Sequence, residues 1–274
     1  MPVDFETFLT ERRYLKGISE RTVEYYRDCF RQFGNNPTPN EDYLKQFVIR
    51  MRERGMKETS CNDYIRGINA YLKWAGFSLK IQKVKEPKHV LPTYCEQDLQ
   101  RLIQWKPNDW HGRRLHLLVL CLIDSGARIN ELLTLRWRQV DLDNMLVTFD
   151  GKGAKQRILP FSIELRRHLY RWKQEGAHDL VFCTKTGVAL THRNTMHSVV
   201  GLCHKLKLNV PERSLHAFRH TFALNYLRRG GSVFHLQRVL GHATLEMTRR
   251  YVNLTTEDLQ QEHERVSVLS GRVR

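Results

Sequence analysis

The sequence lacks a long apolar run: none of its segments reaches the roughly 18 consecutive apolar residues that a membrane-spanning helix needs. Its first residues also lack the basic start and apolar stretch of a secretory signal. The six cysteines are scattered without any C-x-x-C pair, which is typical of reduced core cysteines and not of a disulfide framework or a zinc site. We therefore expect a chain that works in the reducing cytoplasm, away from membranes.

Acidic residues are too few to balance the basic ones. Lys and Arg number 45 against 29 Asp and Glu, a net charge of +16. Through Val90 the counts are 17 and 12, so 28 and 17 remain for the rest, and both parts are basic. Such an excess favours a polyanionic partner, most simply nucleic acid. A soluble protein with a net positive charge but no such partner would have a similar composition.

The first part of the chain reads as short helices. Residues 20–34, 41–55 and 59–76 repeat apolar side chains at helical spacing, and each run ends at a glycine. They predict a small helical bundle over residues 1–80. Residues 81–92 are charged, carry two prolines and have no helical face, so we interpret them as an interdomain linker.

Residues 93–255 form a second, mostly helical domain. One segment breaks the helical period: β-prone residues at 146–149 and 158–161 flank a turn with two glycines, which predicts a β-hairpin. The predicted fold class is therefore mainly α with a small β-sheet or hairpin.

Five short motifs follow one another in this second part. They are SGARINELL with Arg128 and Glu131, DGKGAKQR with Lys152, HAFRHTFA with His216 and Arg219, LGH with His242, and finally Tyr251. Taken singly, each motif has an ordinary structural explanation, such as an exposed helix face or a core tyrosine. Their order and spacing resemble the tyrosine recombinase (phage integrase) family, and the N-terminal bundle is similar to that family's helical (SAM-like) core-binding domain.

These residue types suit attack on a phosphodiester. The planar guanidiniums of Arg128 and Arg219 match anionic phosphate oxygens, and a phenol such as Tyr251 becomes a nucleophile when a base takes its proton. His216 is the candidate base, and His242 is expected to donate to a phosphate oxygen. We interpret His220 as a structural histidine that points away from this face.

The resemblance implies further roles. Lys152 would protonate the leaving 5′ oxygen, with Lys155 as the alternative, and Glu131 would orient Arg128. It also implies a 3′-phosphotyrosine intermediate without metal, cofactor or ATP, a Holliday junction, and four protomers on two duplexes. Residues 256–274 would form a helix that docks on a neighbouring protomer. The expected DNA contacts are Arg66, Lys73, Lys83, Lys85, Lys155 and Arg249.

The biological task stays open among integration and excision, transposition, and resolution of multimers. No additional arm-binding module is visible before the bundle, which favours a compact, Xer-like or transposon-type member, nucleoid-associated when bound to DNA. Three alternatives remain: a type IB topoisomerase-like nicking enzyme, a DNA-binding regulator without chemistry, and a metal-dependent nuclease using Asp141, Asp143 and Asp150, which we interpret more simply as turn residues.

Overall fold

The computed structural model describes residues 4–34, 39–87, 91–150, 156–176, 178–212 and 214–252, together with His263 and Ser267. The chain divides into two compact units, Met1–His89 and Val90–Arg274. No helix in the described part of the chain is long and apolar enough to cross a membrane.

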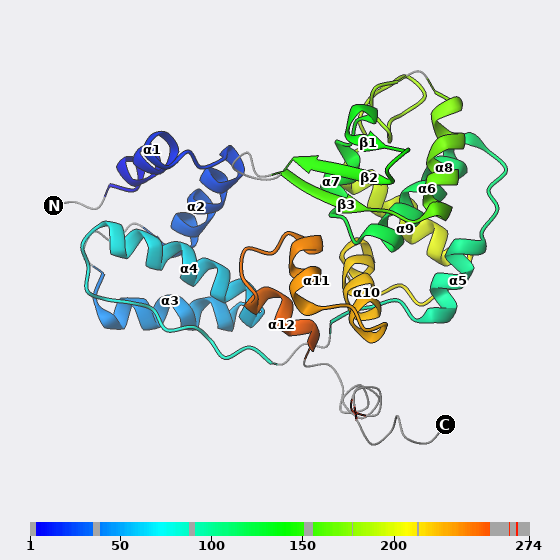
Figure 1. Cartoon of the computed structure of the whole chain (residues 1–274). Coiled ribbons are helices and arrows are strands. Elements are labelled where there is room, and N and C mark those ends of the chain that lie inside the picture. The colour runs from blue at the N-terminus through cyan, green and yellow to red at the C-terminus, as the bar shows by residue number, and fades with distance from the viewer. Residues whose placement is uncertain are drawn as a thin grey trace. The chain divides into compact units, whose positions relative to one another are not determined.

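The first unit is a bundle of helices α1 (Phe5–Lys16), α2 (Glu20–Phe33), α3 (Glu41–Glu53) and α4 (Glu58–Trp74) (Figure 1). Its core is rich in aromatic rings: Phe8 and Tyr71 are fully buried and meet edge to face, with ring centroids 5.5 Å apart. Such pairs add to the free energy gained from apolar burial. The three segments that the apolar spacing predicted as helices are α2, α3 and α4.

Close packing of α2 against α4 depends on Gly67. A Cβ at this position would lie 2.4 Å from Cys29 Sγ and 3.0 Å from the Tyr25 hydroxyl oxygen. We expect Gly67→Ala to lower the free energy of unfolding of the first unit by about 1–3 kcal/mol, because the two helices must separate. Thermal unfolding checks this. The control is Gly201→Ala in another helix, where a Cβ meets no atom within 4 Å and stability should hold or rise; equal melting of both variants would contradict the prediction.

The first part of the expected linker lies against α4. Asn69 donates to the carbonyl of Ile81 at 2.9 Å and accepts from its N–H at 2.8 Å, and Asn62 makes the same pair of bonds with Val84 at 2.8 Å each. Ile81 is 4% exposed. The hydrogen bonds of this extended backbone are made with side-chain amides, so the segment needs no helical period in its sequence. The boundary between the two units falls between His89 and Val90.

The second unit contains a helical core and one small sheet. Strands β1 (Val140–Asp141), β2 (Leu146–Asp150) and β3 (Gln156–Pro160) are antiparallel in that order, with Leu146 opposite Pro160 and Asp150 opposite Gln156. The predicted hairpin is confirmed, and β1 is an addition. The remaining elements are α5 (Glu96–Gln104), α6 (Trp110–Ser125), α7 (Ile129–Leu133), the 3₁₀ turn η1 (Trp137–Gln139), α8 (Ile163–Gln174), α9 (His192–Lys205), α10 (Ser214–Arg228), α11 (Val233–Leu240) and α12 (Glu246–Val252).

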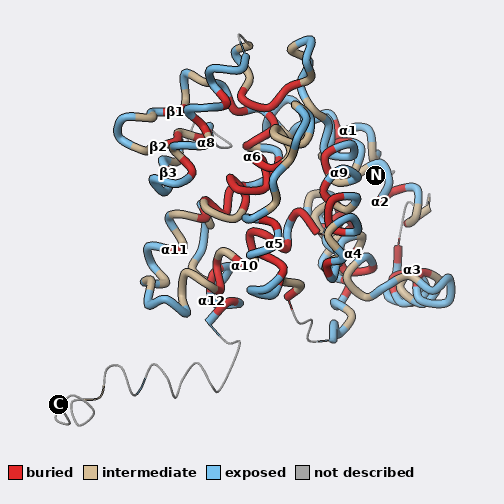
Figure 2. The backbone as a smooth tube through the Cα atoms, turned by 90° about the vertical axis from the view of Figure 1, so that its right-hand side faces the viewer, coloured by how far each residue is buried: buried red, intermediate tan, exposed pale blue. Residues whose placement is uncertain are grey.

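Helix α6 supplies the centre of this unit. Its residues from His116 to Leu122 are all buried (Figure 2), and it packs against α5, α8 and α10. The fold class is confirmed: a mostly helical chain with a three-stranded sheet. Helices α10, α11 and α12 pack on one another and carry three of the five motifs.

Candidate active site

Arg128 begins α7 directly after a tight turn at the end of α6. Gly126 has φ 59°, and a Cβ there would lie 2.4 Å from a ring carbon of Phe222, so only glycine fits this turn. Arg128 donates from its backbone N–H to Glu131 Oε2 at 2.7 Å and from Nη1 to Glu131 Oε1 at 2.9 Å. Glu131 therefore accepts hydrogen bonds from both the backbone and the guanidinium of Arg128.

Arg219 reaches the same place from α10. It is 7% exposed, and it donates to the carbonyl oxygens of Gly126 at 2.8 Å and Leu240 at 2.5 Å. Burial, and then the charges of Arg128 and Arg157, lower the pKa of Arg219 to about 9. The group therefore stays charged at neutral pH.

Arg157, on β3, is a third arginine in this cluster, and no role was predicted for it from the sequence. Its Nη2 donates to Glu131 Oε2 at 2.6 Å and its Nη1 donates to the Leu240 carbonyl. The side chain is 11% exposed. Arg157 is the last residue of the motif DGKGAKQR and could have been noticed there. Spacing along the sequence did not show that the hairpin brings it to Glu131.

The three guanidiniums converge on the C-terminus of α11. The Leu240 carbonyl accepts from Arg157 and Arg219, and the Gly241 carbonyl accepts from Arg128 Nη2 at 3.3 Å. Carbonyls at a helix C-terminus carry partial negative charge, which together with the Glu131 carboxylate offsets the repulsion between the cations. Gly241 has φ 62°, and a Cβ on it would lie 2.9 Å from Arg157 Cδ, which explains the glycine of the LGH motif.

His242 follows at once and is held by its own partner. Its Nδ1 lies 2.9 Å from Thr248 Oγ1, and Thr248 is fully buried. Burial, and then the charges of Arg219 and the neighbouring arginines, lower the pKa of His242 to about 4. The imidazole is therefore neutral at physiological pH, and a hydroxyl that donates to Nδ1 leaves the proton on Nε2.

We expect Thr248→Val, which keeps the volume and removes the hydroxyl, to slow the DNA cleavage that the family resemblance implies by about 10- to 100-fold, as the loss of a histidine's outer partner does in metal sites. Single-turnover cleavage of target DNA measures this. The matched control is Thr195→Val. Thr195 is a buried threonine whose hydroxyl donates to the backbone carbonyl of Thr191, at the start of α9. Cleavage by the Thr248 variant at the wild-type rate would show that the tautomer is set otherwise.

Tyr251, on α12, lies beside these groups. It is 4% exposed, and its ring is nearly parallel to that of His242, with centroids 6.4 Å apart. Burial raises the pKa of Tyr251, and the nearby charges of Arg219, Arg250 and Arg128 oppose that rise. The hydroxyl is thus protonated at rest and needs a base to become a nucleophile.

The partner of the Tyr251 hydroxyl is His220, whose Nδ1 lies 2.9 Å from it. The interpretation of His220 as a histidine that points away is wrong. His216, Arg219 and His220 are three and four residues apart, so they share one face of α10. His216, the expected base, is exposed, whereas Arg219 is buried and His220 is partly buried.

The remaining expected site residues fall into two groups. The first group lies outside the described residues: it comprises Lys152, Lys155 and the tail at 256–274. Only His263 and Ser267 of that tail are described. The other expected DNA contacts are exposed: Arg66 pairs with Asp63 at 2.6 Å and Arg249 with Glu246 at 3.4 Å, and Lys73, Lys83 and Lys85 also face solvent.

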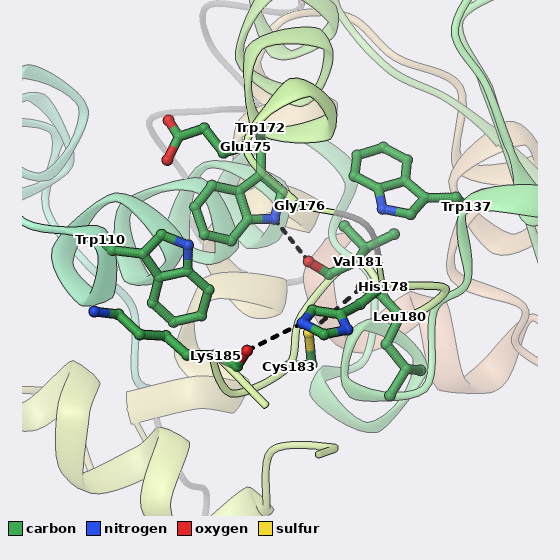
Figure 3. Close-up of a pocket in the computed structure, with 10 residues that line it drawn as sticks. All are labelled: Trp110, Trp137, Trp172, Glu175, Gly176, His178, Leu180, Val181, Cys183 and Lys185. Carbon is green, nitrogen blue, oxygen red and sulfur yellow. Dashed lines mark hydrogen bonds between the residues drawn. The ribbon is translucent and has the colours of Figure 1, made fainter. Parts of the chain in front are cut away.

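Two other features do not join this cluster. Asp141 accepts from the backbone N–H groups of Asp143 and Asn144 at 3.0 and 2.9 Å, which is the turn role expected of it. A separate cavity of about 300 Å³ is lined by Trp110, Trp137 and Trp172 (Figure 3). Trp172 Nε1 donates to the Val181 carbonyl at 2.8 Å there, and no residue of the arginine cluster lines it.

Comparison with known proteins agrees with this geometry. Residues 94–258 match the model of the phage integrase family. The tyrosine recombinase XerA of Pyrococcus horikoshii is 30% identical over 278 residues, covering 97% of this chain and 93% of the relative. XerC of Xanthomonas axonopodis pv. citri is 27% identical, covering 79% of this chain and 74% of the relative.

Solved structures show the same fold. The Tn1549 transposon integrase in complex with a circular intermediate DNA matches with a TM-score of 0.79 at 17% identity over 97% of this chain and 100% of that one. The XerH recombinase bound to a palindromic difH substrate matches with 0.76 at 19% identity, over 95% and 83%. The alternatives of a topoisomerase-like enzyme and a non-catalytic regulator are not favoured. The chain belongs to the phage integrase family and is a site-specific tyrosine recombinase.

Proposed function

We propose that this enzyme cleaves and rejoins double-stranded DNA at a recombination site through a covalent 3′-phosphotyrosine link on Tyr251, without metal or ATP. One observation carries the proposal: a buried tyrosine hydroxyl lies beside a neutral histidine and a cluster of arginines that share one carboxylate. Such a cluster suits a phosphate, whose transfer depends mainly on positioning and charge stabilisation.

Arg128 and Arg219 act as the clamps on the non-bridging oxygens. Arg128 has the accessible guanidinium, with its side chain 43% exposed, whereas Arg219 is buried beneath it. His242, neutral with Nε2 protonated, donates a hydrogen bond to a phosphate oxygen. Lys152 protonates the departing 5′ oxygen, with Lys155 as the alternative donor. A histidine of α10 takes the phenolic proton, and His216 is the candidate that the motif suggests.

The phosphotyrosine keeps the energy of the broken bond, so a 5′ hydroxyl from a second duplex can reseal the strand. This chemistry supports exchange through a Holliday junction by four protomers on two duplexes, with residues 256–274 docking on a neighbour. Among the solved structures of similar fold, the XerH recombinase is bound to a palindromic difH substrate and a lambda integrase dimer is bound to a core site. The task would be integration and excision, transposition or multimer resolution.

DNA contacts are proposed for the exposed cations of both units. Arg66, Lys73, Lys83 and Lys85 in the first unit and Arg249 in the second would meet phosphates, and the net charge of +16 supports a polyanionic partner. Binding through such contacts weakens steeply as salt rises.

The decisive experiment traps the covalent complex. DNA linked to the protein in its own host is recovered and sequenced, and the site is rebuilt as a nicked duplex that loses its 5′ hydroxyl end on cleavage. We expect a protease-sensitive conjugate in the presence of EDTA, and strand exchange between paired sites. Relaxation of supercoils without exchange would favour the topoisomerase-like alternative, and cleavage abolished by EDTA would favour a metal-dependent nuclease.

A further inference from the structure

One contact in the site has no role in the proposed chemistry as it stands. Helix α10 places His220 next to Arg219, and His220 Nδ1 lies 2.9 Å from the Tyr251 hydroxyl oxygen. The two ring centroids are 5.7 Å apart with the planes inclined by 47°. The distance lies within the range of about 2.6–3.2 Å at which a side chain can accept a proton directly.

We propose that His220 is the proton acceptor for Tyr251 during DNA cleavage. The inference rests on the proposed function and assigns a catalytic role to a residue that the motif comparison left as structural. As the Tyr251 oxygen bonds to phosphorus and the bond from phosphorus to the 5′ oxygen breaks, the phenolic proton passes to His220 Nδ1. The 5′ oxygen takes its proton from Lys152, and both transfers reverse on resealing.

The surroundings of Tyr251 explain why a partner on the hydroxyl matters. The ring is 4% exposed, so bulk water has little access to the oxygen. An unionised phenol is a weak nucleophile, and the nearby arginines favour the phenolate without being able to take its proton. On this face of α10, a ring nitrogen of His220 lies within hydrogen-bond distance of the hydroxyl.

The charge that would form on His220 lies next to Tyr251, on which the cations Arg219, Arg250 and Arg128 also act. Two anionic groups offset it. Glu131 already pairs with Arg128 and Arg157, and the phosphate brings its own charge when DNA binds. The phosphate would therefore offset part of the positive charge that proton transfer places on His220.

The test separates proton transfer from simple positioning. His220→Asn places an amide where Nδ1 stood, so it keeps a hydrogen-bonding atom but cannot accept a proton. We expect both His220→Asn and His220→Ala to slow formation of the covalent adduct on nicked DNA by about 10²- to 10⁴-fold. Replacing Tyr251 by 3,5-difluorotyrosine, a more acidic phenol, should restore most of the rate, because that phenol needs less help from a base.

His168→Asn is the matched control, since His168 is a half-buried histidine of the same unit outside the cluster; its rate should be unchanged. A rate for His220→Asn near or above that of the wild type would overturn the proposal, and so would a slow variant that difluorotyrosine does not rescue. A large loss with His216→Asn but none with His220→Asn would return the role to His216. If the wild type itself forms no adduct, the proposed function fails instead.

Discussion

Tyr251→Phe is expected to abolish covalent capture of DNA while leaving DNA binding unchanged. The substitution removes the hydroxyl oxygen that we propose as the nucleophile and keeps the buried ring beside His242. The lost hydrogen bond to His220 should cost about 1 kcal/mol of folding free energy, too little to unfold the catalytic unit. Adduct formation is measured on nicked target DNA by denaturing gel, and binding by titration of the same DNA.

The matched control for Tyr251→Phe is Tyr71→Phe. Tyr71 is also fully buried, and its hydroxyl has no hydrogen-bond partner among the described residues, so its removal should leave both binding and cleavage at wild-type levels. A conjugate that survives in the Tyr251 variant, mapped to another side chain, would refute the assignment of the nucleophile.

Arg128→Lys is expected to slow adduct formation on the order of 10³-fold, the scale seen when a positioned charge donor is removed from a transition state. The guanidinium donates to Glu131 and to the Gly241 carbonyl from separate nitrogens, so it is held in one orientation with its remaining N–H groups available. A lysine ammonium is a compact charge on a flexible stem and cannot reproduce that fork. Single-turnover kinetics with DNA in excess of its dissociation constant isolates the chemical step.

Arg136→Lys provides the control for Arg128→Lys. Its side chain is 44% exposed against 43% for Arg128, and it also pairs with a carboxylate, that of Asp179, outside the cluster. The same conservative change there should leave cleavage intact. If both variants cleave equally well, or if Arg128→Lys merely weakens DNA binding, Arg128 does not stabilise the transition state.

Much of the secondary structure was predictable because several helices are buried along one face only, which leaves a helical period in the sequence. The apolar spacing in residues 20–34, 41–55 and 59–76 corresponds to α2, α3 and α4, and the two glycine-flanked strands form β2 and β3. The contacts made by the expected linker were not predictable in this way. The backbone of its first part is hydrogen-bonded to the side-chain amides of Asn62 and Asn69, and these pairs, 22 and 12 residues apart, leave no periodic pattern in the sequence.

The residues of the candidate site were predicted from the sequence, but the hydrogen bonds between them were not. The motifs pointed to Arg128, Glu131, Arg219, His242 and Tyr251, and the fold brings these together. Arg157 was missed because its importance comes from reaching Glu131 and Leu240, 26 and 83 positions away. The prediction for His220 was wrong although the four-residue spacing on a helix alone puts it on the face of His216.

The amino-acid sequence by itself determined which faces of the helices are apolar and where the hairpin turns. It also determined that two arginines, a lysine, two histidines and a tyrosine follow one another in the order of the phage integrase family. Only the tertiary structure decided that three guanidiniums meet on the last carbonyls of α11 and that the tyrosine hydroxyl rests on His220. The physical reason is that local periodicity records whether a side chain is buried. Which distant backbone carbonyl or ring nitrogen it meets depends on how α6, α10, α11 and β3 pack, and that is a property of the whole core.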